Sequence, residues 1–285
     1  MKLSKGQIGR RLLGWAVAGT AIGVCGNAFA ELGQPAPWEY KLQESASPVM
    51  DNITSFHNFL FFLITIITLF VLALLVIVAV KFNAKANPVP SKTTHNTLIE
   101  VAWTLIPVLI LVGIAVPSFR LLFQELDIPK ADLTIKATGK QWYWTYNYPD
   151  AKIEFDSQLA CDEKRIKCES PRLLAVDNNV VVPVNKIIRV ETTGADVIHS
   201  FAMPAFGIKI DAIPGRLNET WFKATKLGMF YGQCSELCGR DHAYMPIVVK
   251  VVTDEEFAKW LTDAKKQFSS AGDSNYVSAA DGAAH

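Results

Sequence analysis

Two long apolar runs near the start of the chain constrain its fold more than any other feature. Residues 57–80 contain no Asp, Glu, Lys or Arg, and residues 98–119 form a second run that includes two prolines. A helix needs about 20 apolar residues to cross the hydrocarbon core of a bilayer, and proline is tolerated in such helices. We therefore predict a transmembrane helical hairpin over residues 56–123; two buried helices of a soluble core are the alternative.

The charges around these runs predict the orientation of the hairpin. The connecting loop, residues 81–97, carries three lysines and no acid, whereas residues 31–55 carry four acids and one lysine. Positively charged loops stay on the cytoplasmic side. We therefore expect a cytoplasmic loop at 81–97, with both outer ends of the hairpin exported.

The first 30 residues have the pattern of a secretory signal peptide. Lys2, Lys5, Arg10 and Arg11 precede an apolar stretch, and the small residues Ala28 and Ala30 fit a cleavage site. Cleavage there would leave residues 31–55 as an exported N-terminal segment. Because residues 1–30 hold four basic and no acidic residues, the remainder has 24 basic and 27 acidic residues. This balance, without a basic stripe, gives no reason to expect nucleic-acid binding.

After residue 131 the pattern changes to short β-branched runs between Gly, Pro and Asn turns. Examples are residues 133–138, 180–184, 186–192 and 246–252. Strands of this length and spacing predict an all-β sandwich or barrel over residues 124–253. Residues 254–268 predict a C-terminal helix, with acids early and lysines late. The small, polar residues 269–285 predict a disordered tail.

The most informative chemical pattern is a twelve-residue run that contains Cys234, Cys238, His242 and Met245, with His199 upstream. Thiolate and thioether are soft donors and imidazole is borderline, so together they favour copper. A mononuclear blue-copper site needs one thiolate, and the second leaves enough sulfur to bridge two ions. A tetrahedral zinc site and a disulfide between the two cysteines are the alternatives. Zinc, however, has no need of Met245.

Five motifs in order give the chain a specific resemblance to subunit II of haem-copper cytochrome c oxidase, closest to the alphaproteobacterial and mitochondrial branch. They lie at residues 95–107, 141–146, 197–201, 211–216 and 231–239. The resemblance implies a two-helix transmembrane hairpin followed by a cupredoxin-like domain. It also implies a bacterial inner-membrane location with this domain in the periplasm.

The resemblance further implies a binuclear copper centre, CuA, whose ligands are His199, Cys234, the backbone carbonyl of Glu236, Cys238, His242 and Met245. The two thiolates would bridge the coppers and each imidazole would bind one. The carboxylate of Glu236 would meet a magnesium ion at the contact with subunit I, since carboxylates suit hard cations. Without the family, a solvated loop acid would be the better interpretation of Glu236.

As implied by the family, the chain would accept electrons from cytochrome c and pass them to haem in subunit I. The complex, which would also include subunit III, would reduce oxygen to water and pump protons. Trp142 would accept the electron, although a buried aromatic is the alternative. Glu100 would stand near a proton path, although stabilisation of a helix N-terminus is a serious alternative.

Acidic residues suggest how a basic cytochrome would approach. Residues 124–285 contain 22 acidic and 19 basic residues. Four of the acids lie in or near the stretch that the family turns toward its donor, and they would speed encounter electrostatically: Asp150, Glu154, Asp156 and Asp177.

Two departures from the family pattern are visible. Lys140 stands where the family commonly has His, and Cys161 and Cys168 flank an insertion-like loop in which we expect a disulfide.

Two other classes of protein fit the sequence less well. A quinol-oxidase subunit II generally lacks the copper ligands, all of which are present here. A copper-delivery protein or mononuclear electron carrier would not need the second cysteine or the double span. No Cys-x-x-Cys-His run for covalent haem occurs in the sequence, so the electron donor should be a separate protein.

Overall fold

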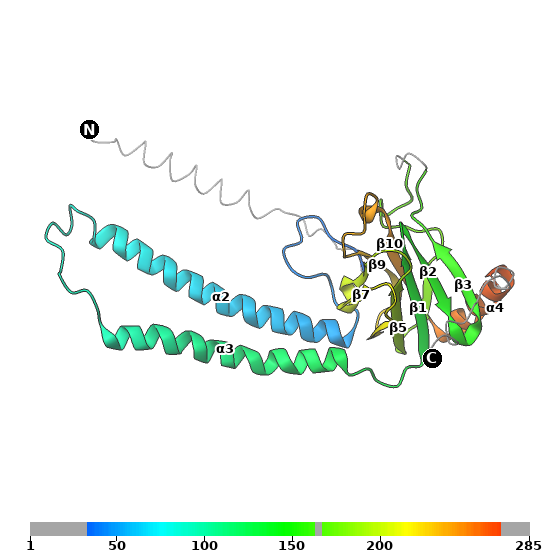
Figure 1. The fold of residues 1–285 in the computed structure, drawn as a ribbon, viewed down its shortest axis with the longest axis horizontal. Helices are drawn as coiled ribbons and strands as arrows, with labels where there is room; N and C mark the ends of the chain where they lie inside the picture. Colours follow the sequence, from blue (N-terminus) through cyan, green and yellow to red (C-terminus); the bar gives the residue numbers. More distant parts are fainter. Residues whose placement is uncertain (1–32, 163–166, 269–285) are drawn as a thin grey trace, which may run out of the picture.

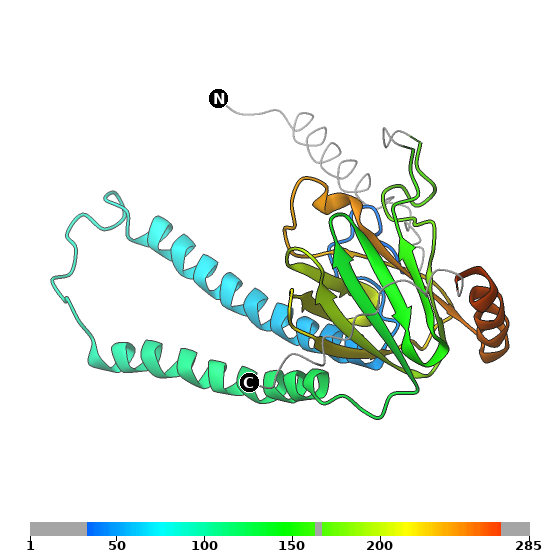
Figure 2. The same cartoon turned by 45° about the vertical axis from the view of Figure 1, so that its right-hand side comes forward.

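The computed structural model describes residues 33–162 and 167–268. A helical hairpin extends from one side of a β domain, and the loop between its helices lies at the end farthest from that domain (Figures 1 and 2). The predicted signal peptide and C-terminal tail lie outside the described residues.

The hairpin consists of α2, Pro48–Lys81, and α3, Thr97–Leu126. Both helices are long and apolar enough to cross a membrane, and their most apolar windows have no buried residues. Helices of a soluble core would have these faces covered by other parts of the chain, and within residues 33–162 and 167–268 nothing covers them. The two helices contact each other near the β domain and diverge toward the connecting loop (Figures 1 and 2). At the β-domain end the amide of Asn52 donates to Gln124 Oε1 at 2.7 Å.

Helix α2 begins nine residues before the apolar run, inside the segment expected to be a separate exported stretch. Ser47 is its N-cap: its hydroxyl accepts from Met50 N at 3.0 Å, and Pro48 takes the first helical position. Proline is favoured there because the first turn needs no donor. The cap thus places the start of the helix before the apolar run, at a position that hydrophobicity alone does not predict.

The same cap joins the hairpin to the β domain. Ser47 Oγ also donates to Phe206 O at 2.7 Å, Ala46 N donates to Ala205 O, and Thr225 N donates to Ala46 O. Gly207, at φ +72°, leaves room for α2: a Cβ there would lie 2.7 Å from Ile53 Cδ1. The start of α2 is therefore part of the packed domain.

The β domain is a cupredoxin-like sandwich of two five-stranded sheets, ordered β3-β2-β1-β5-β8 and β4-β10-β9-β6-β7. In each sheet one neighbouring pair is parallel, β1 with β5 and β4 with β10, and the other neighbours are antiparallel. The strands are β1 Leu133–Lys140, β2 Tyr143–Tyr148, β3 Ile153–Ser157, β4 Val180–Pro183, β5 Ile187–Gly194, β6 His199–Met203, β7 Ile208–Ala212, β8 Asn218–Lys223, β9 Gly228–Cys234 and β10 Pro246–Val252. Short 3-10 turns η1 Pro149–Ala151, η2 Pro204–Phe206 and η3 His242–Tyr244 connect some of them.

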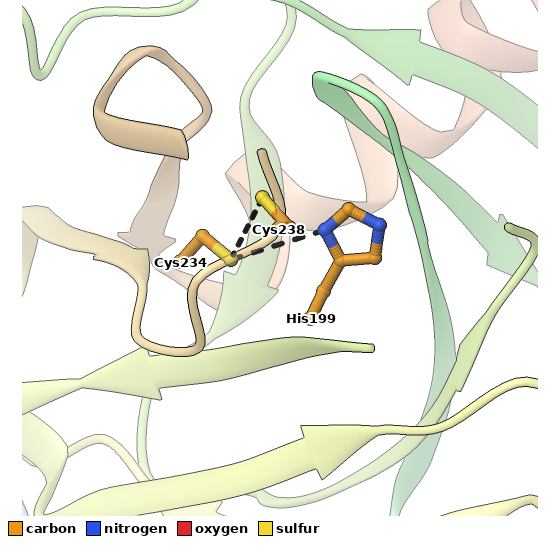
Figure 3. A group of neighbouring side chains, drawn as sticks. All are labelled: His199, Cys234 and Cys238. Carbon is orange, nitrogen blue, oxygen red and sulfur yellow. Dashed lines mark hydrogen bonds between the residues drawn. The ribbon is translucent and has the colours of Figure 1, made fainter. Parts of the chain in front are cut away.

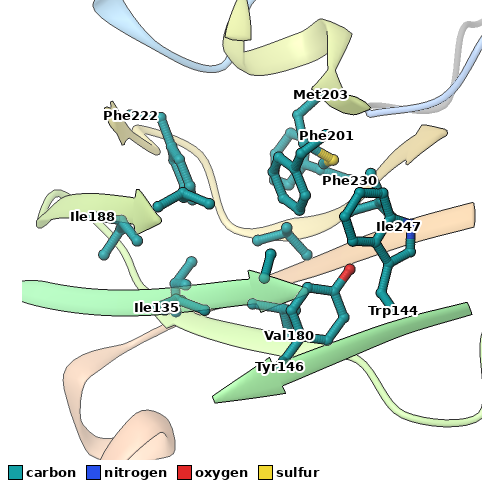
Figure 4. Packing of buried hydrophobic residues seen from close by; sticks show 14 of the residues in the cluster. Ile135, Trp144, Tyr146, Val180, Ile188, Phe201, Met203, Phe222, Phe230 and Ile247 are labelled. Carbon is teal, nitrogen blue, oxygen red and sulfur yellow. The ribbon is translucent and has the colours of Figure 1, made fainter. Parts of the chain in front are cut away.

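Aromatic side chains fill the space between the sheets (Figure 4). Trp144 of the first sheet meets Phe201 of the second edge-on, with ring centroids 5.6 Å apart. Phe206 stacks on Phe222 at 4.5 Å. Buried aromatics contribute both apolar area and preferred ring geometry, so these pairs fix the spacing of the sheets. Helix α4, Asp254–Phe268, closes one end by placing Trp260 against Tyr148.

Two buried tyrosines of β2 give a matched test of this core. Tyr148 OH donates to Val181 O and accepts from Val181 N, both at 2.9 Å. Tyr146 OH is buried without a hydrogen-bond partner among the described residues. Burial, and secondarily Tyr148, raises the pKa of Tyr146.

We predict that Tyr148→Phe lowers the free energy of unfolding by about 1–3 kcal/mol, because it orphans both backbone groups of Val181. Tyr146→Phe removes a hydroxyl that has no partner, so it should be neutral or stabilising. Thermal unfolding of the detergent-solubilised chain, followed by circular dichroism, measures both. Equal destabilisation by the two variants would contradict the prediction.

Candidate metal centre

Strand pairing brings the first two sulfur and nitrogen donors together. His199 is the first residue of β6 and Cys234 is the last of β9, and the antiparallel register pairs Phe201 with Cys234. His199 Nδ1 consequently lies 3.9 Å from Cys234 Sγ (Figure 3). The two residues are 35 positions apart in the sequence, and the pairing of β6 with β9 brings them together.

The loop after β9 supplies the remaining donors. It turns at Gly239, where φ is +124°, and returns through η3 into β10. Cys238 Sγ lies 3.9 Å from Cys234 Sγ, 3.5 Å from His242 Nδ1 and 3.5 Å from Met245 Sδ. The carbonyl oxygen of Glu236 lies 3.4 Å from Cys234 Sγ. The six predicted ligands therefore form one cluster.

The two cysteines of this cluster are free thiols. Their separation of 3.9 Å is far longer than a disulfide bond of about 2.05 Å, so the disulfide alternative is wrong here. Cys161 and Cys168 are the pair that is joined, across the insertion-like loop. This disulfide is well separated in sequence from the cluster.

Burial shapes the chemistry of the cluster. His199, Cys234, Cys238 and Met245 are all at most 6% exposed, and His242 is half-buried. Burial works to raise the pKa of the Cys234 thiol, but hydrogen bonds with the His199 ring and the Glu236 backbone lower it to about 7. Burial, then the neighbouring Cys234, raises the pKa of Cys238 to about 12. Two thiolates this close in a dry site need a bound cation to balance their charge.

The donor set fits a soft metal. Two thiols and an imidazole have ligand atoms that all lie within 4.8 Å of one another. A thioether and a carbonyl oxygen stand at the edges of the group, next to Cys238 and Cys234 respectively. Zinc sites use thiolates and imidazoles in a closed set of four, whereas thioether ligation is typical of copper.

Trp142 lies directly against the cluster. Its indole Nε1 donates to the backbone carbonyl of Cys238 at 3.3 Å, and Gln141 Nε2 donates to the same oxygen at 2.8 Å. The guanidinium of Arg240 lies over the Trp142 ring, 5.4 Å from its centroid. Trp142 is half-buried, so one part of its ring contacts the cluster and another part reaches solvent.

Trp144 and Tyr146, two other aromatics of this run, belong to the buried core. Trp144 is fully buried, donates from Nε1 to Met245 O at 3.3 Å, and meets the His199 ring edge-on at 6.0 Å. Lys140, the departure from the family pattern, places its ammonium 5.3 Å from the ring centroid of Tyr143. It therefore borders the Gln141–Trp142 turn without touching the thiols.

The predicted docking acids are divided between two places. Glu154 and Asp156 are exposed on β3, and Asp177 lies close by, since Asn178 donates to Asp156 O at 2.9 Å. Asp150 is in η1, the turn between β2 and β3, at the opposite end of β2 from Trp142. A docking role for all four stays a prediction, with Asp150 the farthest from Trp142 along the strand.

Glu236 and Glu100 are placed differently. The Glu236 side chain is exposed while its carbonyl faces the cluster. Glu100 is in the first turn of α3, at the far end from the β domain, and its carboxylate accepts from Asn96 N at 3.2 Å. This bond caps the helix. The proton-path role of Glu100 stays a prediction.

Two family models match this chain over most of its length. The model for the periplasmic domain of cytochrome c oxidase subunit II matches residues 133–252, and the model for its transmembrane domain matches residues 35–121. The chain belongs to the cytochrome c oxidase subunit II family. The membrane hairpin and the β domain with the cluster are its two family domains.

Individual relatives agree. "Probable cytochrome c oxidase subunit 2" of Rickettsia bellii is 51% identical over 249 residues, covering 87% of this chain and 92% of that protein. Cytochrome c oxidase subunit 2 of Cereibacter sphaeroides is 45% identical over 266 residues, with 87% and 88% covered. A crystal structure of the periplasmic domain of subunit II from Bradyrhizobium japonicum is 71% identical, covers 50% of this chain and 99% of that chain, and has a TM-score of 0.47.

Sequence reasoning missed three residues around the cluster. Asp196 contacts the His199 ring, Gln141 binds the Cys238 carbonyl, and Arg240 covers Trp142. An acid three residues before a histidine was a usable signal for Asp196, since ligating histidines commonly donate to carboxylates. Nothing in the sequence pattern marks Gln141 or Arg240.

Gly139 gives a test of how tightly the cluster is packed. A Cβ at this position of β1 would lie 2.7 Å from the His199 ring, and the ring is fully buried. We predict that Gly139→Ala displaces His199 and weakens metal binding at least tenfold, measured by metal titration of the full chain. Thr138→Ala, on the same strand, is the matched control. Unchanged metal affinity in Gly139→Ala would show that the ring has room to move.

Proposed function

We propose that this chain is the electron-accepting subunit of a cytochrome c oxidase and holds a pair of copper ions as CuA. The observation that carries the proposal is the buried pair of free thiols, flanked by two imidazoles, a thioether and a carbonyl oxygen. The metals would be held by His199, Cys234, the Glu236 carbonyl, Cys238, His242 and Met245. When bound, the copper pair would take up and release one electron with little change of geometry.

The residues around the cluster prepare it for that task. Trp144 and the Gly139 backbone pack against the His199 ring, which is fully buried, and Phe201 packs behind Trp144. A rigid, dry ligand set keeps the rearrangement on electron uptake small, because its donors are already oriented. Trp142 offers a continuous route inward, from a partly exposed ring through Nε1–H to the Cys238 carbonyl.

The partners follow from the family. Soluble cytochrome c would donate electrons near Trp142, steered by the acids of β3 and the Asp177 turn. Haem in subunit I would receive them, subunit III would complete the core, and the complex would reduce oxygen to water with proton pumping. The exposed Glu236 carboxylate would bind a magnesium ion shared with subunit I. The hairpin would sit in the bacterial inner membrane, with the β domain in the periplasm.

Copper loading of the detergent-solubilised full chain tests the centre directly. We predict two coppers per chain and an electron paramagnetic resonance signal from one unpaired electron spread over both. Cys234→Ser should lose this signal, because only one sulfur remains to bridge, while Cys161→Ser with Cys168→Ser should keep it. A single copper in the unaltered chain, or zinc in its place after purification, would refute the proposal.

Two variants should separate electron uptake from proton uptake in the purified oxidase. Trp142→Ala is expected to slow reduction of the copper centre by cytochrome c at least tenfold without changing copper content. Glu100→Ala should leave that step unchanged and lower turnover and pumping. Stopped-flow reduction and proton release by the reconstituted enzyme measure the two steps. If each variant affected the step assigned to the other, or neither had an effect, these roles would be wrong.

A further inference from the structure

The carboxylate of Asp196 collects three donors beside the metal cluster. Oδ1 lies 2.8 Å from His199 Nε2 and accepts from Val197 N at 2.7 Å, and Oδ2 accepts from Gln141 N at 2.7 Å. The side chain is 35% exposed, so it stands at the rim of the buried site. A rim carboxylate needed only for solubility would not be engaged on both oxygens.

The contact with His199 decides which ring nitrogen can bind a metal. Nδ1 is the nitrogen that faces Cys234 Sγ, at 3.9 Å. It binds a metal only when it carries no proton, so the proton of the neutral ring must be on Nε2. A carboxylate 2.8 Å from Nε2 favours that tautomer and increases the donor strength of the ring. The orientation is also fixed, because Gly139 and Trp144 pack against the ring.

The contact with Gln141 extends the network to the second thiol. Gln141 N donates to Asp196, while Gln141 Nε2 and Trp142 Nε1 both donate to Cys238 O. A continuous chain of hydrogen bonds therefore runs from His199 through Asp196 and Gln141 to Cys238. It joins one ligand on β6 to another on the loop after β9, through the turn between β1 and β2.

We propose that Asp196 is a positioning residue that fixes the metal-binding nitrogen of His199 and holds the Gln141–Trp142 turn on Cys238. The inference rests on the proposed function, because it assigns a role toward the metals that these ligands would hold. Asp196 acts through His199 and Gln141 and does not itself bind the metal. One oxygen contacts His199 and the other accepts from Gln141 N. The orientation of the His199 ring and the contact of Trp142 with Cys238 therefore depend on each other.

Variants of Asp196 in the full chain test this role. Asp196→Ala removes every acceptor and should weaken copper binding about 10–100-fold, the usual effect of losing a carboxylate behind a histidine ligand. Asp196→Asn keeps the size but offers one acceptor oxygen, so it should fall between alanine and the unaltered chain. Asp263→Asn on α4, which loses a charge from an exposed pair with Lys266, is the matched control and should bind copper normally.

Three measurements distinguish positioning from packing: copper affinity in competition with a chelator, the copper resonance spectrum, and the reduction potential. Both Asp196 variants should have altered spectra and more positive potentials, because the ring becomes a weaker donor and a negative charge is lost. If Asp196→Asn matched the unaltered chain in all three, the positioning role would be overturned. If the unaltered chain itself bound no copper pair, the proposed function would fail before any variant was compared.

Discussion

The antiparallel pairing of β6 with β9 is the contact on which the site depends. Its register sets Phe201 opposite Cys234, which brings His199 to the first thiol and turns Phe201 into the core against Trp144. A shift of one residue would move every side chain of β6 to the other face of the sheet. His199 would then leave the cluster and Phe201 would leave the core. Folding of the sandwich and assembly of the ligands are therefore one event.

Much of the architecture could be predicted from the sequence because hydrophobic patterning is local. The two spans, the strands expected at residues 133–138, 186–192 and 246–252, and the helix expected at 254–268 all follow from periodicity and charge. They correspond to α2, α3, β1, β5, β10 and α4, with β5 starting one residue later, at Ile187. The start of α2 at Pro48 could not be found in this way. Its local signal is the N-cap Ser47 followed by Pro48, which hydrophobicity does not detect. The bond of Ser47 to Phe206, more than 150 residues away, has no local pattern at all.

The candidate site divides in the same manner. Cys234, Cys238, His242 and Met245 lie within one loop, so their spacing alone predicted a shared site. His199 lies 35 residues upstream and was added to them by its donor chemistry and by the resemblance. Only strand pairing brings its Nδ1 to the Cys234 thiol. Gln141 and Arg240 have ordinary identities, and their importance comes from backbone geometry in the β1–β2 turn and in the cysteine loop. Supporting residues of this kind are set by tertiary structure, which is why a motif names ligands but not their neighbours.

The joint between α2 and the β domain has a mechanical consequence. A tether of flexible residues would let the soluble part tumble above the bilayer. Here the backbone N–H of Ala46 donates to Ala205 O, and its carbonyl accepts from Thr225 N. The next residue, the N-cap Ser47, donates from its hydroxyl to Phe206 O, and the helix begins directly after it. The start of α2 is therefore rigidly joined to the β domain. With the hairpin in a membrane, this joint would set the height and tilt of the thiol pair relative to the lipid surface without help from another subunit.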